Sequence, residues 1–209
     1  MTVAHVDELD RIAMPDGFVW RPIRRHFDIR AFGVNAYTAS EPGGLIVERH
    51  TEDQLGHEEI YLVLRGRAQF TIDENEHELG AGQLVFVRDP SLQREAIAID
   101  EDTVVLAFGG KPGAPHEVSA WEAMFAAMPA YERDDWDEAI RIHEEALAER
   151  PDHAALLFNL ACMEARGGRH LDALLHLKRA VEMDPKWAEY AVKDSDFAAI
   201  RDEPGFPAA

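Results

Sequence analysis

The chain has 209 residues, of which 46% are hydrophobic and 29% are charged, a composition typical of a globular protein with one domain or two small ones. It carries 21 basic and 40 acidic residues, so the formal net charge of −19 would repel a phosphate backbone or an anionic membrane surface. No run approaches the roughly 20 apolar residues that span a bilayer. We therefore expect a soluble protein and exclude nucleic acid and membranes as primary partners.

Cysteine usage and the N-terminal residues predict the compartment. Cys162 is the single cysteine, so no intrachain disulfide forms. The opening segment MTVAHVDELDRIAMPDG has acidic residues and a proline where a secretory signal has a basic start and an apolar core. Both features predict a cytoplasmic location.

The first half of the chain has the pattern of an antiparallel β-domain. Short runs with strand character are separated by turns rich in glycine and acidic residues, with no helices between them. The predicted strands are FDIRAFGVNAYTA (27–39), GLIVERH (44–50), EIYLVLR (59–65), RAQFTID (67–73), QLVFV (83–87), REAIAI (94–99) and TVVLAF (103–108). This pattern favours a sandwich or a small closed barrel.

The pattern changes near residue 116. The segment GGKPGAP (109–115) is rich in glycine and proline and is predicted to be a linker, and helical spacing begins at Glu117. The chain is therefore predicted to be an α+β protein of two domains, an all-β domain over residues 1–116 and an all-α domain over residues 117–209.

Two segments of the β-domain carry a resemblance to a known family. In HEEIYLVLRGRAQFTID (57–73), Glu59 and Gly66 are seven residues apart, and in LGAGQLVFVRDPSLQ (79–93) a second motif starts at Gly82. Over residues 19–108 the chain resembles the cupin superfamily, which implies a jelly-roll barrel, often a dimer, with three histidines and a glutamate holding a divalent metal. Here residues 52–55 are EDQL where the paired histidines are expected, and the position of the third histidine is Gln93.

Two hypotheses follow for the interior of the barrel. In the first, the metal ligands have been lost, no cofactor is bound, and the barrel takes a small ligand; the candidate pocket residues are Tyr61, Phe70, Phe86, Arg88 and Gln93. In the second, strand alternation places His57 on the same face as Glu59, and an alternative set binds Fe, Mn, Ni or Zn. That alternative set is His50, His57, Glu59 and Gln93.

The second half contains an internal repeat. Ala139, Ala146 and Pro151 recur 34 residues later as Ala173, Ala180 and Pro185. A 34-residue period with small residues at helix crossings and proline after the second helix resembles the tetratricopeptide repeat, a helical hairpin. Pro129 is expected to interrupt the first helix of the preceding hairpin, and a short helix is expected to start at Asp194 or Ser195.

The tetratricopeptide resemblance implies a concave surface that binds a peptide or a partner helix. Carried over by register, the groove positions are Ala155, Phe158, Asn159, Cys162, Ala165 and Arg166. Because two hairpins are fewer than the roughly three repeats that stand alone, the alternative is that this face packs on the barrel or in a homodimer.

The preferred functional hypothesis is a non-enzymatic protein, with a barrel that binds a small ligand or acts as a scaffold and a helical unit for protein contacts or self-association. The alternative is a metal-dependent cupin enzyme, a dioxygenase or isomerase, acting on a small polar substrate.

Overall fold

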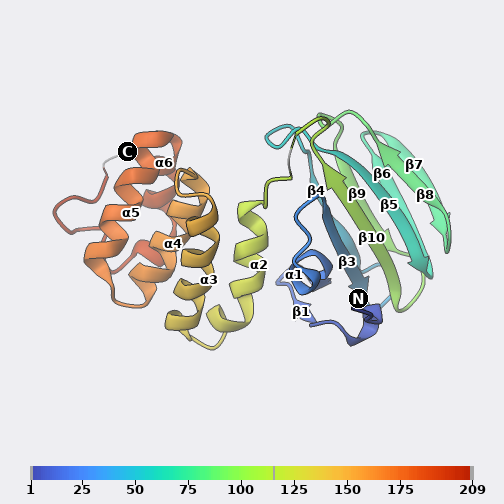
Figure 1. Cartoon of the computed structure of the whole chain (residues 1–209), viewed down its shortest axis with the longest axis horizontal. Coiled ribbons are helices and arrows are strands. Elements are labelled where there is room, and N and C mark those ends of the chain that lie inside the picture. The colour runs from blue at the N-terminus through green and yellow to red at the C-terminus, as the bar shows by residue number, and fades with distance from the viewer. Residues whose placement is uncertain (1, 115, 208–209) are drawn as a thin grey trace. The chain divides into compact units, whose positions relative to one another are not determined.

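The computed structural model of the chain describes residues 2–114 and 116–207, and the chain divides into two compact units, Met1–Val118 and Ser119–Ala209 (Figure 1). Each unit has its own hydrophobic core. The assignment of domains to residues 1–116 and 117–209 stays a prediction.

The first unit is built from two antiparallel sheets that face each other (Figure 1). The larger sheet has the order β1 (Ile12–Ala13), β2 (Val19–Arg21), β3 (Gly33–Ala39), β10 (Thr103–Gly110), β5 (Glu58–Arg65), β8 (Leu84–Val87). The smaller sheet has the order β4 (Leu45–His50), β9 (Arg94–Ala98), β6 (Arg67–Ile72), β7 (Asn75–Gly80). The predicted antiparallel β-domain is confirmed.

The core of this unit lies between the sheets, because alternate residues of each strand point inward. On β5, Tyr61 and Val63 point inward beside Val105 of the adjacent strand β10, and Phe70 of β6 faces them from the other sheet. The rings of Tyr61 and Phe70 are 5.5 Å apart. This inward face of β5 also carries the polar residues described below.

The structure differs from the predicted elements at several places in this unit, and the short strands β1 and β2 were not among those predicted. Residues 23–27 form the helix α1 (Ile23–Phe27), which ends at Asp28 in the left-handed conformation, so the strand predicted from residue 27 begins at Gly33. The strand β7 was missed because its sequence, NEHELG, is polar and mostly exposed and lacks apolar alternation. The strand β10 continues to Gly110, so the first two residues of the predicted linker belong to the sheet.

The second unit consists of helices packed as antiparallel hairpins (Figure 1). These are α2 (Ala120–Tyr131), α3 (Trp136–Glu149), α4 (Ala154–Arg166), α5 (His170–Met183) and α6 (Lys186–Lys193), followed by the 3-10 turn η2 (Ser195–Phe197). Asp194 caps η2 by accepting a hydrogen bond from the backbone of Asp196, so the predicted start of this short helix is confirmed. Among the described residues, no helix is long and apolar enough to span a membrane.

The repeated small residues pack where the helices cross. Ala139, Ala173 and Ala180 are fully buried, and α4 contributes the fully buried Leu157 to the same core. Pro129 does not interrupt α2, contrary to the prediction. It lies in the last turn, where a missing amide donor costs one hydrogen bond close to the end of the helix and leaves the preceding turns intact.

Candidate functional site

A group of polar and titratable side chains lies at one end of the space between the two sheets. Its members, called the intersheet cluster here, are His50, Glu52, His57, Glu59, Tyr61 and Arg94. Strand alternation directs Glu59 and Tyr61 inward from β5, and Gly109 on the adjacent strand leaves room for Glu59, because a Cβ there would lie 3.2 Å from Glu59 Cγ. The cluster therefore joins both sheets at the end of the core.

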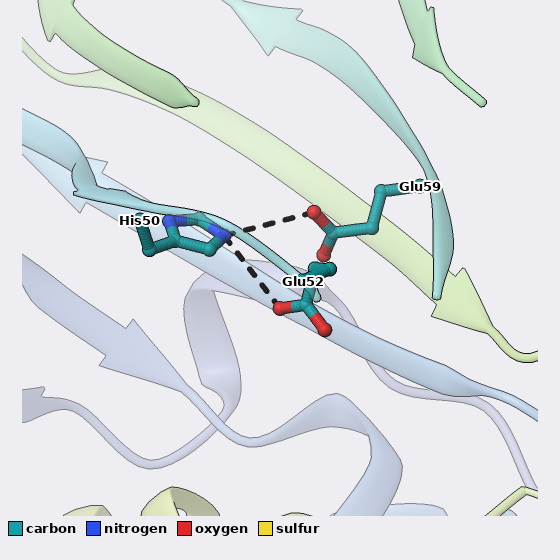
Figure 2. A group of neighbouring side chains, drawn as sticks. All are labelled: His50, Glu52 and Glu59. Carbon is teal, nitrogen blue, oxygen red and sulfur yellow. Dashed lines mark ion pairs between the residues drawn. The ribbon is translucent and has the colours of Figure 1, made fainter. Parts of the chain in front are cut away.

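Glu59 is the centre of the cluster. Its Oε2 accepts a hydrogen bond from the Tyr61 hydroxyl at 2.6 Å and lies 3.6 Å from His50 Nε2. His50 Nε2 also lies 3.7 Å from Glu52 Oε1, so the imidazole stands between two carboxylates (Figure 2). The other ring nitrogen of His50, Nδ1, donates to the carbonyl of Glu48 at 2.7 Å, which fixes the ring.

A second imidazole, that of His57, pairs with one of these carboxylates, Glu52. His57 Nδ1 lies 3.2 Å from Glu52 Oε2, and both side chains are about 90% buried. The centre of the His116 ring lies 6.0 Å from that of His57, and the two rings are tilted by 34°. Burial and the neighbouring charges of His57 and Arg24 lower the pKa of His116, so this imidazole favours its neutral form.

Arg94 was not predicted, and it supplies the cluster with a buried positive charge. It is the first residue of β9 and the cross-strand partner of His50, and its side chain is completely buried. Its Nε lies 3.7 Å from Glu59 Oε2, and its Nη2 donates to the carbonyl of Asp89 at 3.2 Å. Its Nε and Nη1 have no hydrogen-bond partner among the described residues.

The signal that would have found Arg94 is strand parity. Arg94 is in phase with Ala96 and Ala98, which are small, apolar and buried, and so a charged residue in that phase predicts an internal ion pair. Gln93, the residue chosen by its family position, has the opposite phase.

The electrostatics of the cluster follow from burial and pairing. Burial alone would lower the pKa of His50, but the close contact with Glu59, the hydrogen bond to the Glu48 carbonyl and the charges of Glu59 and Glu52 outweigh it and raise that pKa. Burial, and then the charge and hydrogen bond of Glu59, raise the pKa of Tyr61 well above its usual range. Tyr61 is thus held as a neutral donor to Glu59.

One subset of the cluster has the geometry of a partial metal site. The ligand atoms of His50, Glu52 and Glu59 lie within 4.8 Å of one another. Against this, Glu59 Oε2 already faces the Tyr61 hydroxyl and the Arg94 guanidinium. One imidazole and two carboxylates beside a buried guanidinium do not fit the set of three imidazoles and a carboxylate that the cupin resemblance implies.

Of the predicted pocket residues, Tyr61 and Phe70 lie in the core and Phe86 and Arg88 do not. The partners of Glu59 and Tyr61 on β8 are Val87 and Val85, so Phe86 points to the outer face, where it is 48% exposed. Arg88 is also exposed, stacks 5.1 Å from the centre of the Phe86 ring and pairs with Glu58. The expectation that Phe86 and Arg88 face the interior was wrong because it weighed residue type rather than strand phase.

Gln93 lies away from the cluster. Its Oε1 accepts a hydrogen bond from Arg49 Nε at 2.6 Å, and Arg49 points to the opposite face of β4 from its neighbour His50. The structure therefore does not bring Gln93 to His50, His57 and Glu59. It lines a shallow polar pocket of about 470 Å³ together with Arg49, Asp73, Glu74 and Asn75.

The predicted groove of the helical unit is covered by the unit's own C-terminal segment, Asp194–Phe206, and by α6. The Phe158 ring lies 4.6 Å from that of Trp187 and 5.4 Å from that of Phe197. Cys162 Sγ lies 3.8 Å from Asp194 Oδ2, and burial raises the pKa of this thiol well above its usual range. Cys162 is therefore a core residue rather than a reactive thiol.

The remaining groove positions do not form an open surface either. Arg166 pairs with Asp196 and lies over the Trp136 ring at 4.7 Å, and Ala165 is buried. Ala155 and Asn159 are partly exposed. The expectation of an open groove at these six positions is corrected, because the chain itself supplies aromatic side chains, Phe197 and Phe206 among them, that occupy the space.

The helical hairpins match a known repeat family. Residues 125–186 match the tetratricopeptide repeat. The match covers α3, α4 and α5, which carry the 34-residue repeat, together with the second half of α2. No curated protein matches the chain.

The first unit is similar in structure to cupins. A sugar phosphate isomerase of the cupin superfamily from Silicibacter pomeroyi is 18% identical, with a TM-score of 0.44 over 53% of this chain and 76% of that one. An RmlC-like cupin from Shewanella frigidimarina is 13% identical, with a TM-score of 0.40 over 53% and 91%. A predicted oxalate decarboxylase from Thermotoga maritima is 20% identical, with a TM-score of 0.41 over 53% and 99%. At these values the similarity carries no argument about function.

Proposed function

We propose that this protein is a non-enzymatic, cytoplasmic binding protein. In this proposal the β-unit takes a small polar ligand at the end of the sandwich where the intersheet cluster lies, and the tetratricopeptide unit contacts another protein. The observation that carries the proposal is that the titratable groups of the cluster are paired with one another. His57 pairs with Glu52, and His50 and Tyr61 pair with Glu59, so no base stands free beside an open metal position.

The ligand chemistry follows from the exposed part of the cluster. His50 is about one third exposed, whereas Glu52, His57 and Glu59 are about 90% buried. A ligand that enters from solvent would meet the imidazole of His50 first, with carboxylates behind it. This arrangement suits a small polar molecule with hydroxyl or amine donors better than an apolar one.

Thermal unfolding in the presence of small sugars, sugar acids and amines tests the ligand proposal, because a ligand that binds only the folded state raises the midpoint. We expect at least one class to stabilise the protein and the effect to disappear in His50→Ala. Arg88→Ala, on the outer face, is the matched control and should keep it. A screen without any stabilising compound, or stabilisation that survives His50→Ala, would remove this ligand site.

A metal-dependent enzyme, of the dioxygenase or isomerase type, is the second candidate. It is favoured by the convergence of His50, Glu52 and Glu59. Elemental analysis of protein purified without chelator separates the two candidates. Near-stoichiometric Fe, Mn, Ni or Zn that is lost in Glu59→Gln would favour the enzyme, and a protein that stays metal-free on titration would favour the binding protein.

The protein partner is proposed from the tetratricopeptide match, since such repeats serve protein contacts. A second copy of the chain is the other proposed partner. The edge strand β8 exposes Leu84 and Phe86 on the outer face of the larger sheet, and Leu64 lies exposed on the neighbouring strand β5. An exposed edge with apolar side chains is a surface that pairing with a second copy would cover.

A further inference from the structure

The completely buried guanidinium of Arg94 is the feature of the β-unit that a binding role does not by itself explain. A buried charge is costly unless it is paired, and only one of the three guanidinium nitrogens, Nη2, has a hydrogen-bond partner among the described residues. The nearest negative charge is that of Glu59, whose Oε2 lies 3.7 Å from Arg94 Nε. The ion pair with Glu59 is therefore the contact that compensates this charge.

The position of Arg94 matters as much as its burial. It is paired across the sheet with His50. The carboxylate oxygen that it faces, Glu59 Oε2, also lies 3.6 Å from His50 Nε2, and Glu59 belongs to the convergent group His50, Glu52 and Glu59. A divalent cation bound by this group would stand within a few ångströms of the guanidinium, and two cations at that distance repel each other strongly in a buried site. The side chain of Arg94 and a metal thus compete for the same carboxylate.

We infer that Arg94 replaces a metal ion as the cation of this barrel. Its guanidinium neutralises Glu59, holds that carboxylate toward His50 and Tyr61, and keeps divalent metals out. Arg94 is thus a positioning residue. His50, Glu52 and Glu59 form a latent metal site, which a metal could occupy only once the charge of Arg94 is removed. This inference goes beyond the proposed binding function and does not depend on the identity of the ligand.

The test is a gain of metal binding. Arg94→Met removes the charge and keeps an unbranched apolar side chain of similar length. Isothermal titration of the full chain with Zn²⁺ and Mn²⁺, with elemental analysis after dialysis, should show affinity for one equivalent at least about 100-fold above that of the unmodified protein. Arg94→Lys keeps the charge and should stay as weak as the unmodified protein.

Two further variants make the gain specific. Arg94→Met combined with Glu59→Gln should lose the new affinity, because a ligand atom has been removed. Arg88→Met removes an arginine that pairs with Glu58 on the outer face and changes the net charge by the same amount, and it should gain nothing. A gain in Arg88→Met equal to that in Arg94→Met would show a general charge effect and overturn the inference.

The outcomes separate this inference from the proposed function. A folded Arg94→Met protein that gains no metal affinity overturns the inference alone. Stoichiometric metal in the unmodified protein overturns both. If Arg94→Met does not fold, Arg94→Met with Glu59→Gln, which leaves neither charge buried, should fold with a circular dichroism spectrum like that of the unmodified protein; failure of this double variant to fold also overturns the inference.

Discussion

Replacing Glu59 by glutamine is expected to destabilise the β-unit, because it leaves the guanidinium of Arg94 buried without a counter-charge. Two unit charges 3.7 Å apart interact by about 4 kcal/mol at an effective dielectric constant near 20. Breaking a buried ion pair by removing one partner costs a similar amount, roughly 3–5 kcal/mol. We therefore expect Glu59→Gln to lower the free energy of unfolding of this unit by about 3 kcal/mol.

The assay is a double-mutant cycle with Arg94→Met, measured by urea unfolding of the full chain. Hydrogen exchange of the β5 and β9 peptides assigns the change to the β-unit. Because the double variant leaves neither charge buried, its loss should be smaller than the sum of the two single losses by about 2 kcal/mol. Losses that add to within about 0.5 kcal/mol would refute the reasoning, since they would mean that the two side chains do not interact.

Three other changes test the remaining features. Phe197→Ala removes a fully buried ring that contacts Phe158 and should lower the free energy of unfolding in urea by about 3–5 kcal/mol. Leu171 is 79% exposed, so Leu171→Ala should lower it by less than about 0.5 kcal/mol. Equal losses would contradict the packing of the C-terminal segment. The hydrogen bond to Glu164 raises the pKa of His176. The stabilisation that this pair gives the folded protein is therefore complete below pH about 6.5 and is lost as pH rises through the folded-state pKa of His176. The free energy of unfolding should fall between pH 6 and 9, and His176→Gln should flatten that fall. We expect a dimer by size-exclusion chromatography with light scattering and a monomer for Phe86→Glu, and a monomeric unmodified protein would remove the second copy as a partner.

The fold class was predictable because it depends on residue patterns that the sequence carries locally. The strand β5 contains a short apolar run, β6 alternates polar and apolar residues, and the α-helical hairpins repeat small residues at a fixed period. The strand β7 and the helix α1 were missed for the converse reason. β7 is a polar edge strand held by its partner β6, and α1 is only five residues long.

The candidate site was predictable only in part. Strand phase placed Glu59 and Tyr61 on one face, and their hydrogen bond shows that they do share it. Glu52 was not predicted as a site residue because it lies in a loop, where strand phase gives no direction for its side chain. Arg94 was not predicted because the family position falls on the preceding residue, Gln93. Gln93 was predicted from its position in the family motif, but its side chain accepts a hydrogen bond from Arg49 and does not reach the intersheet cluster.

By itself, the sequence determined a chain with an antiparallel β-unit and helical hairpins, since hydrophobic period and turn residues act within a few positions of one another. It also placed a glutamate at the inward face of a strand. Only the tertiary structure decided which charges meet between the sheets and what covers the helical groove. Those contacts join β4, β5 and β9 in one unit, and α4 with the C-terminal segment in the other, over distances in the chain at which no local pattern operates. The burial of Arg94 beside Glu59 therefore results from tertiary packing and not from any local sequence pattern.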